Sequence, residues 1–319
     1  MYKNFKQIGL DRVVLTVKET EIGFKGDDVT MINVQDGAIR IRHNAMHKDL
    51  LDISVNCPKL FYGTNEKNLN GRELHSVVDV IQEELEKQGL LVDVGNLKLG
   101  SFEVNYNVND EKFYDVFRLI AKANVNDNLK AFYVENKDGI QSVKVKKQRY
   151  NVKIYKKSEH LKEQFEPVEE ENVVRFEVFT NNDIEKAKIM GENLTLQGLI
   201  DNWERVERWY AEKIKLTIKK PVEKYIKQLE DECIALLERG VKPSDVVATL
   251  MLRQDLIDIV AFENAVRKRY KKIGKTKNSS RDVKTAHNRI KKIDEVRYNQ
   301  VVGNVAKLEE LYDLIGLEK

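Results

Sequence analysis

Cysteine is scarce in this chain of 319 residues, which contains only Cys57 and Cys233. The two cysteines stand far apart and form neither a zinc-ligand spacing nor a disulfide framework, so a reducing cytoplasm is the expected location. Long apolar runs are missing too, because no stretch approaches the roughly 20 apolar residues that a membrane-spanning helix needs. We therefore expect a cytoplasmic protein without a membrane partner.

Sequence motifs of several enzyme classes are also missing. No GxxxxGK(S/T) loop occurs and no GxGxxG loop follows a predicted strand, which argues against a P-loop motor and a dinucleotide-dependent enzyme. No serine or cysteine stands in a recognisable nucleophile elbow, which argues against the hydrolases built on that motif.

Charge is unevenly distributed, although the net charge is only +3. Residues 267–297 contain thirteen lysines and arginines but three acids. This excess is too one-sided for pairs along a helix to neutralise, and it predicts contact with nucleic acid. A solvated helix face is the alternative interpretation. We expect residues 274–280 to be a flexible loop against the DNA backbone, and the contacting side chains to be Lys268, Arg269, Lys271, Lys272, Lys275 and Lys277.

The first part of the chain, to about residue 180, consists mainly of predicted strands. These segments are short, rich in Val, Ile and Leu, and separated by turn residues. Helices are predicted over residues 73–88, ended by Gly89, and over residues 110–123. The pattern predicts an α+β fold, with an antiparallel sheet carrying helices on one face and two similar halves. The predicted strands are residues 10–17, 29–34, 38–42, 50–55, 98–108, 130–135, 139–145, 150–157 and 173–180.

The character of the sequence changes after Asn182. Asp183 is expected to cap a helix, and almost everything from there to Lys319 is predicted to be helical. We therefore expect two domains, an α+β domain over residues 1–182 and an all-helical, basic domain over residues 183–319.

Alternation along residues 101–108, 149–157 and 173–179 gives each of these strands one apolar and one polar face. Tyr150 lies on an apolar face and is expected in the core. If the three strands are neighbours, their polar faces form one open surface. That surface would display Glu103, Lys153, Tyr155, Lys157, Arg175 and Glu177.

This set of side chains has a coherent chemistry. Glu103 and Glu177 would bind a hard cation, Mg²⁺ or Mn²⁺, which polarises a phosphodiester oxygen. Tyr155 would attack the phosphorus and hold one strand end covalently. Lys153 and Lys157 would favour the phenolate form of Tyr155, and together with Arg175 they would hold flanking phosphates. The alternative is a solvated face of an antiparallel sheet.

Several short motifs, taken in order, resemble a known family. Pro58–Asn65 is similar to a Pro-Lys-Phe-Leu-x-Gly-x-Asn segment, and Ile154–Lys157 is similar to an Ile-Tyr-Asp-Lys strand. Val174–Val178 is similar to a Leu-Arg-Phe-Glu-hydrophobe strand, and Glu103 stands at the acid of an Arg-hydrophobe-Asp strand. Over most of residues 10–200 the chain thus resembles the gene II/X family of filamentous-phage and plasmid replication proteins, and the related replication initiators and relaxases of Gram-positive plasmids.

The resemblance implies an endonuclease that nicks one strand at a replication origin and so starts rolling-circle replication. It implies a tyrosine nucleophile, a 5′-phosphotyrosine intermediate and a divalent metal. Origin DNA, as a single strand or a hairpin, is the implied partner. We also expect contacts with a host helicase or a second copy of the chain through the helical part.

The sequence departs from the family pattern at three points. Lys156 stands where the family has an aspartate, Ser101 stands where it has an arginine, and no His-hydrophobe-His motif occurs. A phage or plasmid initiator or regulator that binds DNA without cutting it is therefore the alternative. A structural or interaction protein with a merely solvated basic segment is a third interpretation.

Overall fold

The computed structural model describes most of the chain. The described residues are 8–21, 32–34, 36–47, 49–109, 119–121, 123–124, 131–136, 139–164, 168, 170–246, 259–274 and 276–293. Two compact units divide the chain. The first comprises Met1–Glu111, Tyr133–Lys215 and Ile315–Lys319, and the second comprises Lys112–Phe132 and Leu216–Leu314.

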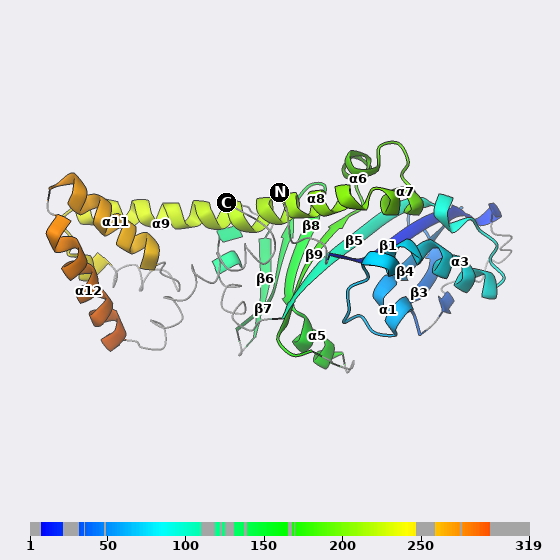
Figure 1. Ribbon diagram of the computed structural model, residues 1–319, viewed down its shortest axis with the longest axis horizontal. Coiled ribbons are helices and arrows are strands. Elements are labelled where there is room, and N and C mark those ends of the chain that lie inside the picture. The colour runs from blue at the N-terminus through cyan, green and yellow to red at the C-terminus, as the bar shows by residue number, and fades with distance from the viewer. Residues whose placement is uncertain are drawn as a thin grey trace. The chain divides into compact units, whose positions relative to one another are not determined.

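One antiparallel sheet dominates the first unit (Figure 1). Its strand order is β2-β3-β4-β1-β5-β9-β8-β7-β6, which confirms the predicted α+β class. Each strand lies within one residue of its predicted bounds, except β2, whose predicted start lies outside the described residues. The strands are β1 Gly9–Lys18, β2 Ile32–Val34, β3 Ile39–His43, β4 Leu50–Asn56, β5 Lys98–Asn109, β6 Ala131–Asn136, β7 Gly139–Lys146, β8 Asn151–Lys156 and β9 Val173–Thr180.

The order of the strands repeats in the two halves of the sheet. In the first half β1 pairs with β4, the last strand of the meander β2-β3-β4. In the second half β5 pairs with β9, the last strand of the meander β6-β7-β8-β9. The two leading strands, β1 and β5, pair antiparallel at the centre. The chain therefore brings its two halves together along β1 and β5.

The sheet has one apolar and one polar face, because successive side chains point to opposite sides. Across β5, β9 and β8 the apolar face carries Val104, Val178 and Val152, which are paired in register and buried. The helix α8, Trp203–Ile214, covers this face. Its Trp209 ring packs on Phe102 and its Tyr210 hydroxyl donates to the Phe176 carbonyl. The other face is left for the functional site.

Short helices surround the sheet after β4 and β8. The helix α1, Cys57–Tyr62, begins where the Asn56 side chain accepts from the Lys59 amide, and it ends at Gly63 in a left-handed conformation. The helix predicted over residues 73–88 is divided at Ser76 into α2, Gly71–His75, and α3, Val77–Lys87. The 3₁₀ turn η2, Val94–Asn96, leads into β5, and α5, Lys157–Glu163, follows β8 directly.

Three helices that follow the predicted boundary at residue 182 belong to the first compact unit. The predicted division into two domains at that residue stays a prediction. The three helices are α6 Asp183–Met190, α7 Leu196–Asp201 and α8. The cap of α6 is Asn182, whose side chain accepts from the Glu185 amide, and not Asp183 as predicted.

The described part of the second unit is mainly helical, although it includes the first two residues of β6. It contains α9 Lys220–Glu238, α11 Ile259–Lys272 and α12 Thr276–Ile293, and a π-helical segment, Lys215–Lys219, precedes α9. None of the described helices has both the length and the apolar composition to cross a membrane. The apolar core of this unit is built from Cys233, Leu237, Val246, Phe262, Ala265, Val266, Val283 and Ala286.

Candidate active site

A cleft of about 480 Å³ opens on the polar face of the sheet. Its floor comes from β1, β5, β8 and β9, and α1 and α5 contribute Lys59 and Lys157 to its lining. Five residues predicted to share an open surface line this cleft, namely Glu103, Lys153, Tyr155, Lys157 and Glu177. The predicted adjacency of the three strands is thereby confirmed, because β5, β9 and β8 are consecutive in the sheet.

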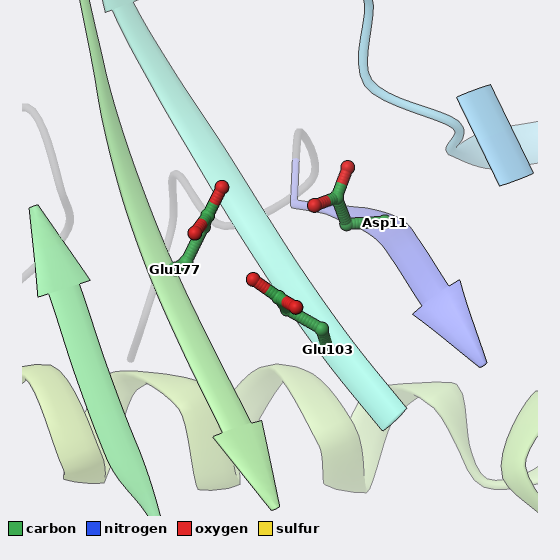
Figure 2. A group of neighbouring side chains, drawn as sticks. All are labelled: Asp11, Glu103 and Glu177. Carbon is green, nitrogen blue, oxygen red and sulfur yellow. The ribbon is translucent and has the colours of Figure 1, made fainter. Parts of the chain in front are cut away.

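Three carboxylates meet at the floor of the cleft (Figure 2). Asp11 comes from β1, Glu103 from β5 and Glu177 from β9, and one oxygen of each lies within 4.8 Å of the others. Figure 2 shows the three side chains turned toward a common point from three neighbouring strands. The sequence predicted Glu103 and Glu177 but missed Asp11.

A β-bulge places Asp11 in this cluster. The register of β1 against β5 shifts between Leu10 and Arg12, so Asp11 has no partner residue across the pair. A bulge inserts one residue and re-aims the side chains beside it. The sequence carries a signal for the bulge. The buried apolar residues of β1 are three positions apart from Leu10 to Val13, whereas a regular strand has them two positions apart.

The surroundings of the cluster do not stabilise three ionised carboxylates at once. Burial and the neighbouring Glu177 and Asp11 raise the pKa of Glu103 well above its usual value. Burial also raises the pKa of Asp11, although the Arg175 guanidinium opposes this effect. The pKa of Glu177 is lowered, because Lys153, Glu103, Arg175 and Tyr155 together outweigh its burial. Two of the three carboxyls therefore ionise with difficulty unless positive charge arrives.

Tyr155 is hydrogen-bonded into the same cluster. Its hydroxyl donates to Glu177 Oε1 at 2.5 Å, and Lys153 Nζ lies 3.8 Å from Glu177 Oε2. The ring of Tyr155 also contacts two cations, with Lys153 Nζ 3.8 Å and Lys157 Nζ 5.8 Å from its centroid. His160 of α5 packs edge-on against the ring at 5.4 Å. The phenol is thus oriented by a carboxylate and enclosed by basic side chains.

The prediction that the lysines favour the phenolate of Tyr155 is wrong. Burial and the negative charge of Glu177 raise the pKa of Tyr155 well above its usual value, and Arg175 only partly opposes them. The two lysines lie over the face of the ring, whereas the hydroxyl itself faces a carboxylate. Any reaction of this phenol therefore needs a group that accepts its proton, and Glu177 is in position to do so.

Arg175 lies beneath the site, which differs from the prediction that it contacts DNA. It is 0% exposed, and its guanidinium contacts Asp11 at 3.2 Å. It also donates to the Asn65 carbonyl at 2.7 Å, the Glu66 carbonyl at 2.9 Å and Asn107 Oδ1 at 2.8 Å. No surface is left for a phosphate, so Arg175 positions Asp11 and the segment after α1. The alternation of apolar and polar residues could predict on which face of the sheet Arg175 lies. It could not predict that another segment of the chain covers this side chain.

One buried amide on this face has no hydrogen-bond partner. Asn105 stands between Glu103 and Asn107 on β5 and is paired in register with Glu177. It is 0% exposed, and both polar atoms of its side chain lack a partner among the residues that the structure describes. Such groups are uncommon in folded proteins and occur at functional sites. The amide oxygen and the three carboxylates are all oxygen donors.

These donors fit a divalent cation. Hard cations such as Mg²⁺ and Mn²⁺ prefer carboxylate and carbonyl oxygens. Asp11, Glu103 and Glu177 each supply one within a span that a single ion can bridge, and a bound cation would favour the ionised form of Asp11 and Glu103, whose pKa is raised. No other group of three or more potential ligands of this kind is found among the described residues.

The basic residues predicted to bind DNA in the second unit form a separate set. Lys268 is ion-paired with Glu230, and Lys272 contacts Glu238 at 2.8 Å. Lys271 is exposed and Arg269 is half-buried, whereas Lys275 and the side chain of Lys277 lie outside the described residues. The expected flexible loop over residues 274–280 is wrong from Thr276 on, because α12 begins there.

Comparisons with known proteins give only distant likenesses. No protein-family model matches the sequence, and no curated protein matches it. Among solved structures, the chain is similar to a rolling circle replication initiator protein from Geobacillus stearothermophilus, with a TM-score of 0.31 and 11% identity over 65% of this chain and 80% of that one. It is also similar to TBP of Methanococcus jannaschii, with a TM-score of 0.24 and 9% identity over 65% of this chain and 99% of that one. Likenesses of this size leave the function to be argued from the site.

Proposed function

We propose that this chain is a replication initiator that nicks one DNA strand by tyrosine attack with a divalent metal. The observation that carries this proposal is the contact between the Tyr155 hydroxyl and Glu177, inside a cluster of three carboxylates and within a basic cleft. A nucleophile, a proton acceptor and a set of metal ligands therefore occupy one site, as phosphoryl transfer to a side chain requires.

The proposed reaction starts from a neutral phenol. Glu177 accepts the proton of Tyr155 as the phenol oxygen forms a bond to phosphorus. The bond from phosphorus to the 3′ oxygen breaks, and that oxygen takes up the proton that Glu177 received, so that a free 3′ hydroxyl forms and Glu177 is a carboxylate again. The 5′ phosphate stays on Tyr155, which conserves the bond energy for rejoining. Lys153, whose side chain is 35% exposed, holds the charge that develops on the phosphate oxygens, while the buried Lys157 stays against the ring of Tyr155.

A cation held by Asp11, Glu103 and Glu177 would polarise a phosphodiester oxygen and stabilise the developing negative charge. The residues around it have defined parts. Arg175 fixes Asp11, and Lys153 keeps Glu177 ionised. The implied partner is origin DNA as a single strand or a hairpin. A host helicase and a second copy of the chain remain proposed partners of the helical part.

The test is covalent capture of a cut strand. The full chain is incubated with single-stranded DNA from its own replicon and Mn²⁺ or Mg²⁺, and adducts that survive denaturation are counted. We expect an adduct with the wild type and none with Tyr155→Phe, which loses the nucleophile but keeps the ring and its cation contacts. The matched control is Tyr150→Phe, which should form the adduct as the wild type does.

Three outcomes separate the alternatives. An adduct with Tyr155→Phe but not with Tyr150→Phe would move the nucleophile to Tyr150. Binding of the DNA without any adduct from the wild type would favour the second candidate, an initiator or regulator that no longer cuts DNA. Tyr155 is only 5% exposed, which argues against the alternative of a solvated sheet face. Absence of both binding and adduct would overturn both candidates.

A further inference from the structure

The cleft carries positive charge on both sides of its carboxylates. On one side lie Lys144, Lys153 and Lys157, from β7, β8 and α5. On the other side lie Arg12, Arg40 and Lys59, from β1, β3 and α1. The proposed reaction uses only the first group, because Lys153 and Lys157 contact Tyr155.

The second group lines the other end of the same cleft. Arg12 is opposite Asn56 in the pairing of β1 with β4, and Arg40 is opposite Ser54 in the pairing of β3 with β4. Asn56 and Ser54 also line the cleft. Three cations from β1, β3 and α1 are thus gathered around two neutral side chains of β4. These neutral side chains cannot compensate the positive charge.

Arg40 and Lys59 have no acidic partner in the part of the chain that the structure describes, whereas the charge of Arg12 acts on the neighbouring Asp11 and Glu103. No carboxylate of the described residues lies within ion-pair distance of Arg12, Arg40 or Lys59. The lysines of the second unit differ, because Lys268 and Lys272 are neutralised by Glu230 and Glu238. Cations that converge in a cleft without acidic partners are an anion site by charge and geometry.

Arg40 lies too far from the carboxylates to act on the phosphate that they would hold. Arg40 is on β3, three strands away from Glu103 on β5, and neighbouring strands are about 4.8 Å apart. The two strands are therefore separated by about 14 Å. Arg12, which is paired in register with Glu103, lies between them. An anion that reaches both ends must be extended and must carry several charges, as a nucleic-acid backbone does.

We propose that Arg12, Arg40 and Lys59 bind the backbone phosphates of single-stranded DNA beside the phosphate that is cut. This inference rests on the proposed function and adds the path of the strand. The strand enters over β3 and β4, crosses β1 and reaches the carboxylates on β5 and β9. The contacts are to phosphates, so they supply affinity and register but no sequence preference.

The test measures DNA binding without cutting. A fluorescein-labelled single strand from the origin region is titrated with the full chain in EDTA, and fluorescence anisotropy is followed at several salt concentrations. The variant is Arg40→Gln combined with Lys59→Gln, which leaves the carboxylates and Tyr155 intact. The matched control is Arg42→Gln, because Arg42 is exposed on the same strand but does not line the cleft.

We expect the double variant to bind at least about tenfold more weakly, as the loss of charged phosphate contacts requires. The slope of log affinity against log salt should become shallower by about 1.4, since each lost contact to a single strand removes about 0.7. Arg42→Gln should bind as the wild type does. An unchanged affinity and slope in the double variant, or an equal loss in Arg42→Gln, would overturn the inference.

The two proposals fail in different ways. If the wild type binds DNA through these residues but never forms an adduct with Mn²⁺, the nicking function fails and the phosphate site stands. If adducts form at Tyr155 while the double variant binds as tightly as the wild type, the nicking function stands and the phosphate site fails. Thermal unfolding of each variant with and without Mn²⁺ shows whether the fold and the carboxylate cluster are intact.

Discussion

Two buried carboxylate sites in the first unit differ in how their charge is balanced. Glu185 on α6 accepts hydrogen bonds from Trp209 at 3.0 Å and Lys188 at 2.8 Å, and Lys213 lies 3.0 Å away. Burial opposes its ionisation, but these donors outweigh burial and lower the pKa of Glu185 to about 2. The cluster of Asp11, Glu103 and Glu177 instead contains two carboxyls whose pKa is raised.

This difference in charge balance indicates that Glu185 stabilises the fold, whereas the cluster of three carboxyls is suited to a ligand. Around Glu185 the protein supplies all the donors that a buried carboxylate needs, and the result joins α6 to α8. At the cluster the protein supplies Arg175 and Lys153, which is too little positive charge to ionise all three carboxyls, and the amide of Asn105 has no partner among the described residues. Buried charge without a partner is destabilising, and a site retains it when a ligand completes the balance.

The largest expected effect is on catalysis. Asp11→Asn keeps a hydrogen-bonding group for Arg175 but removes one ionic ligand. We expect the yield of DNA adduct in Mn²⁺ to fall on the order of 10³-fold, because metal ions contribute several kcal/mol to such transition states. Initial rates of adduct formation measure the effect. The control is Asp79→Asn, an exposed aspartate on α3, and a rate within twofold of the wild type in Asp11→Asn would contradict the role of this residue.

The next effect concerns stability and has opposite signs at the two sites. Glu185→Gln leaves the buried Lys213 with only the exposed Glu212, 3.5 Å away, as a counter-charge, so we expect the free energy of unfolding to fall by about 3 kcal/mol. Glu103→Gln removes a carboxyl that is already hard to ionise, so we expect stability in EDTA to be unchanged or to rise by up to about 1 kcal/mol. Guanidinium unfolding of both variants measures this. A loss in Glu103→Gln as large as in Glu185→Gln would remove the distinction.

The smallest effect is on the pH dependence of stability. Because the folded pKa of Glu185 is about 2, below its ordinary 4.5, its stabilisation is present above pH 4.5 and is lost as pH falls toward 2. Glu103 has a raised pKa, so its contribution is favourable at low pH and is lost as pH rises. We expect Mn²⁺ to reverse the second loss, because the ligands must be deprotonated to bind it. The free energy of unfolding is measured from about pH 2 upward, in Mn²⁺ and in EDTA. We expect the stabilisation by Mn²⁺ to grow with pH, and a stabilisation that shrinks with pH would count against the metal site.

The fold and part of the site could be predicted from the sequence. Alternation fixed the faces of β5, β8 and β9, and it therefore placed Glu103, Tyr155 and Glu177 on one side before their distances were known. It could not show that a bulge turns Asp11 into the same cluster, because a bulge breaks the period on which such predictions depend. Nor could it show that the segment after α1 covers Arg175, since depth depends on packing from elsewhere in the chain. The raised pKa of Tyr155 was missed for the same reason.

The central claim is that Asp11, Glu103 and Glu177 hold one divalent cation beside Tyr155. Anomalous X-ray diffraction from crystals of the protein grown with Mn²⁺ tests it directly and needs no DNA. The account predicts one strong manganese peak bonded to an oxygen of each of the three carboxylates, and no such peak in crystals of Asp11→Asn. A manganese peak elsewhere with none at this cluster, or no peak at all at a saturating concentration, would contradict the account.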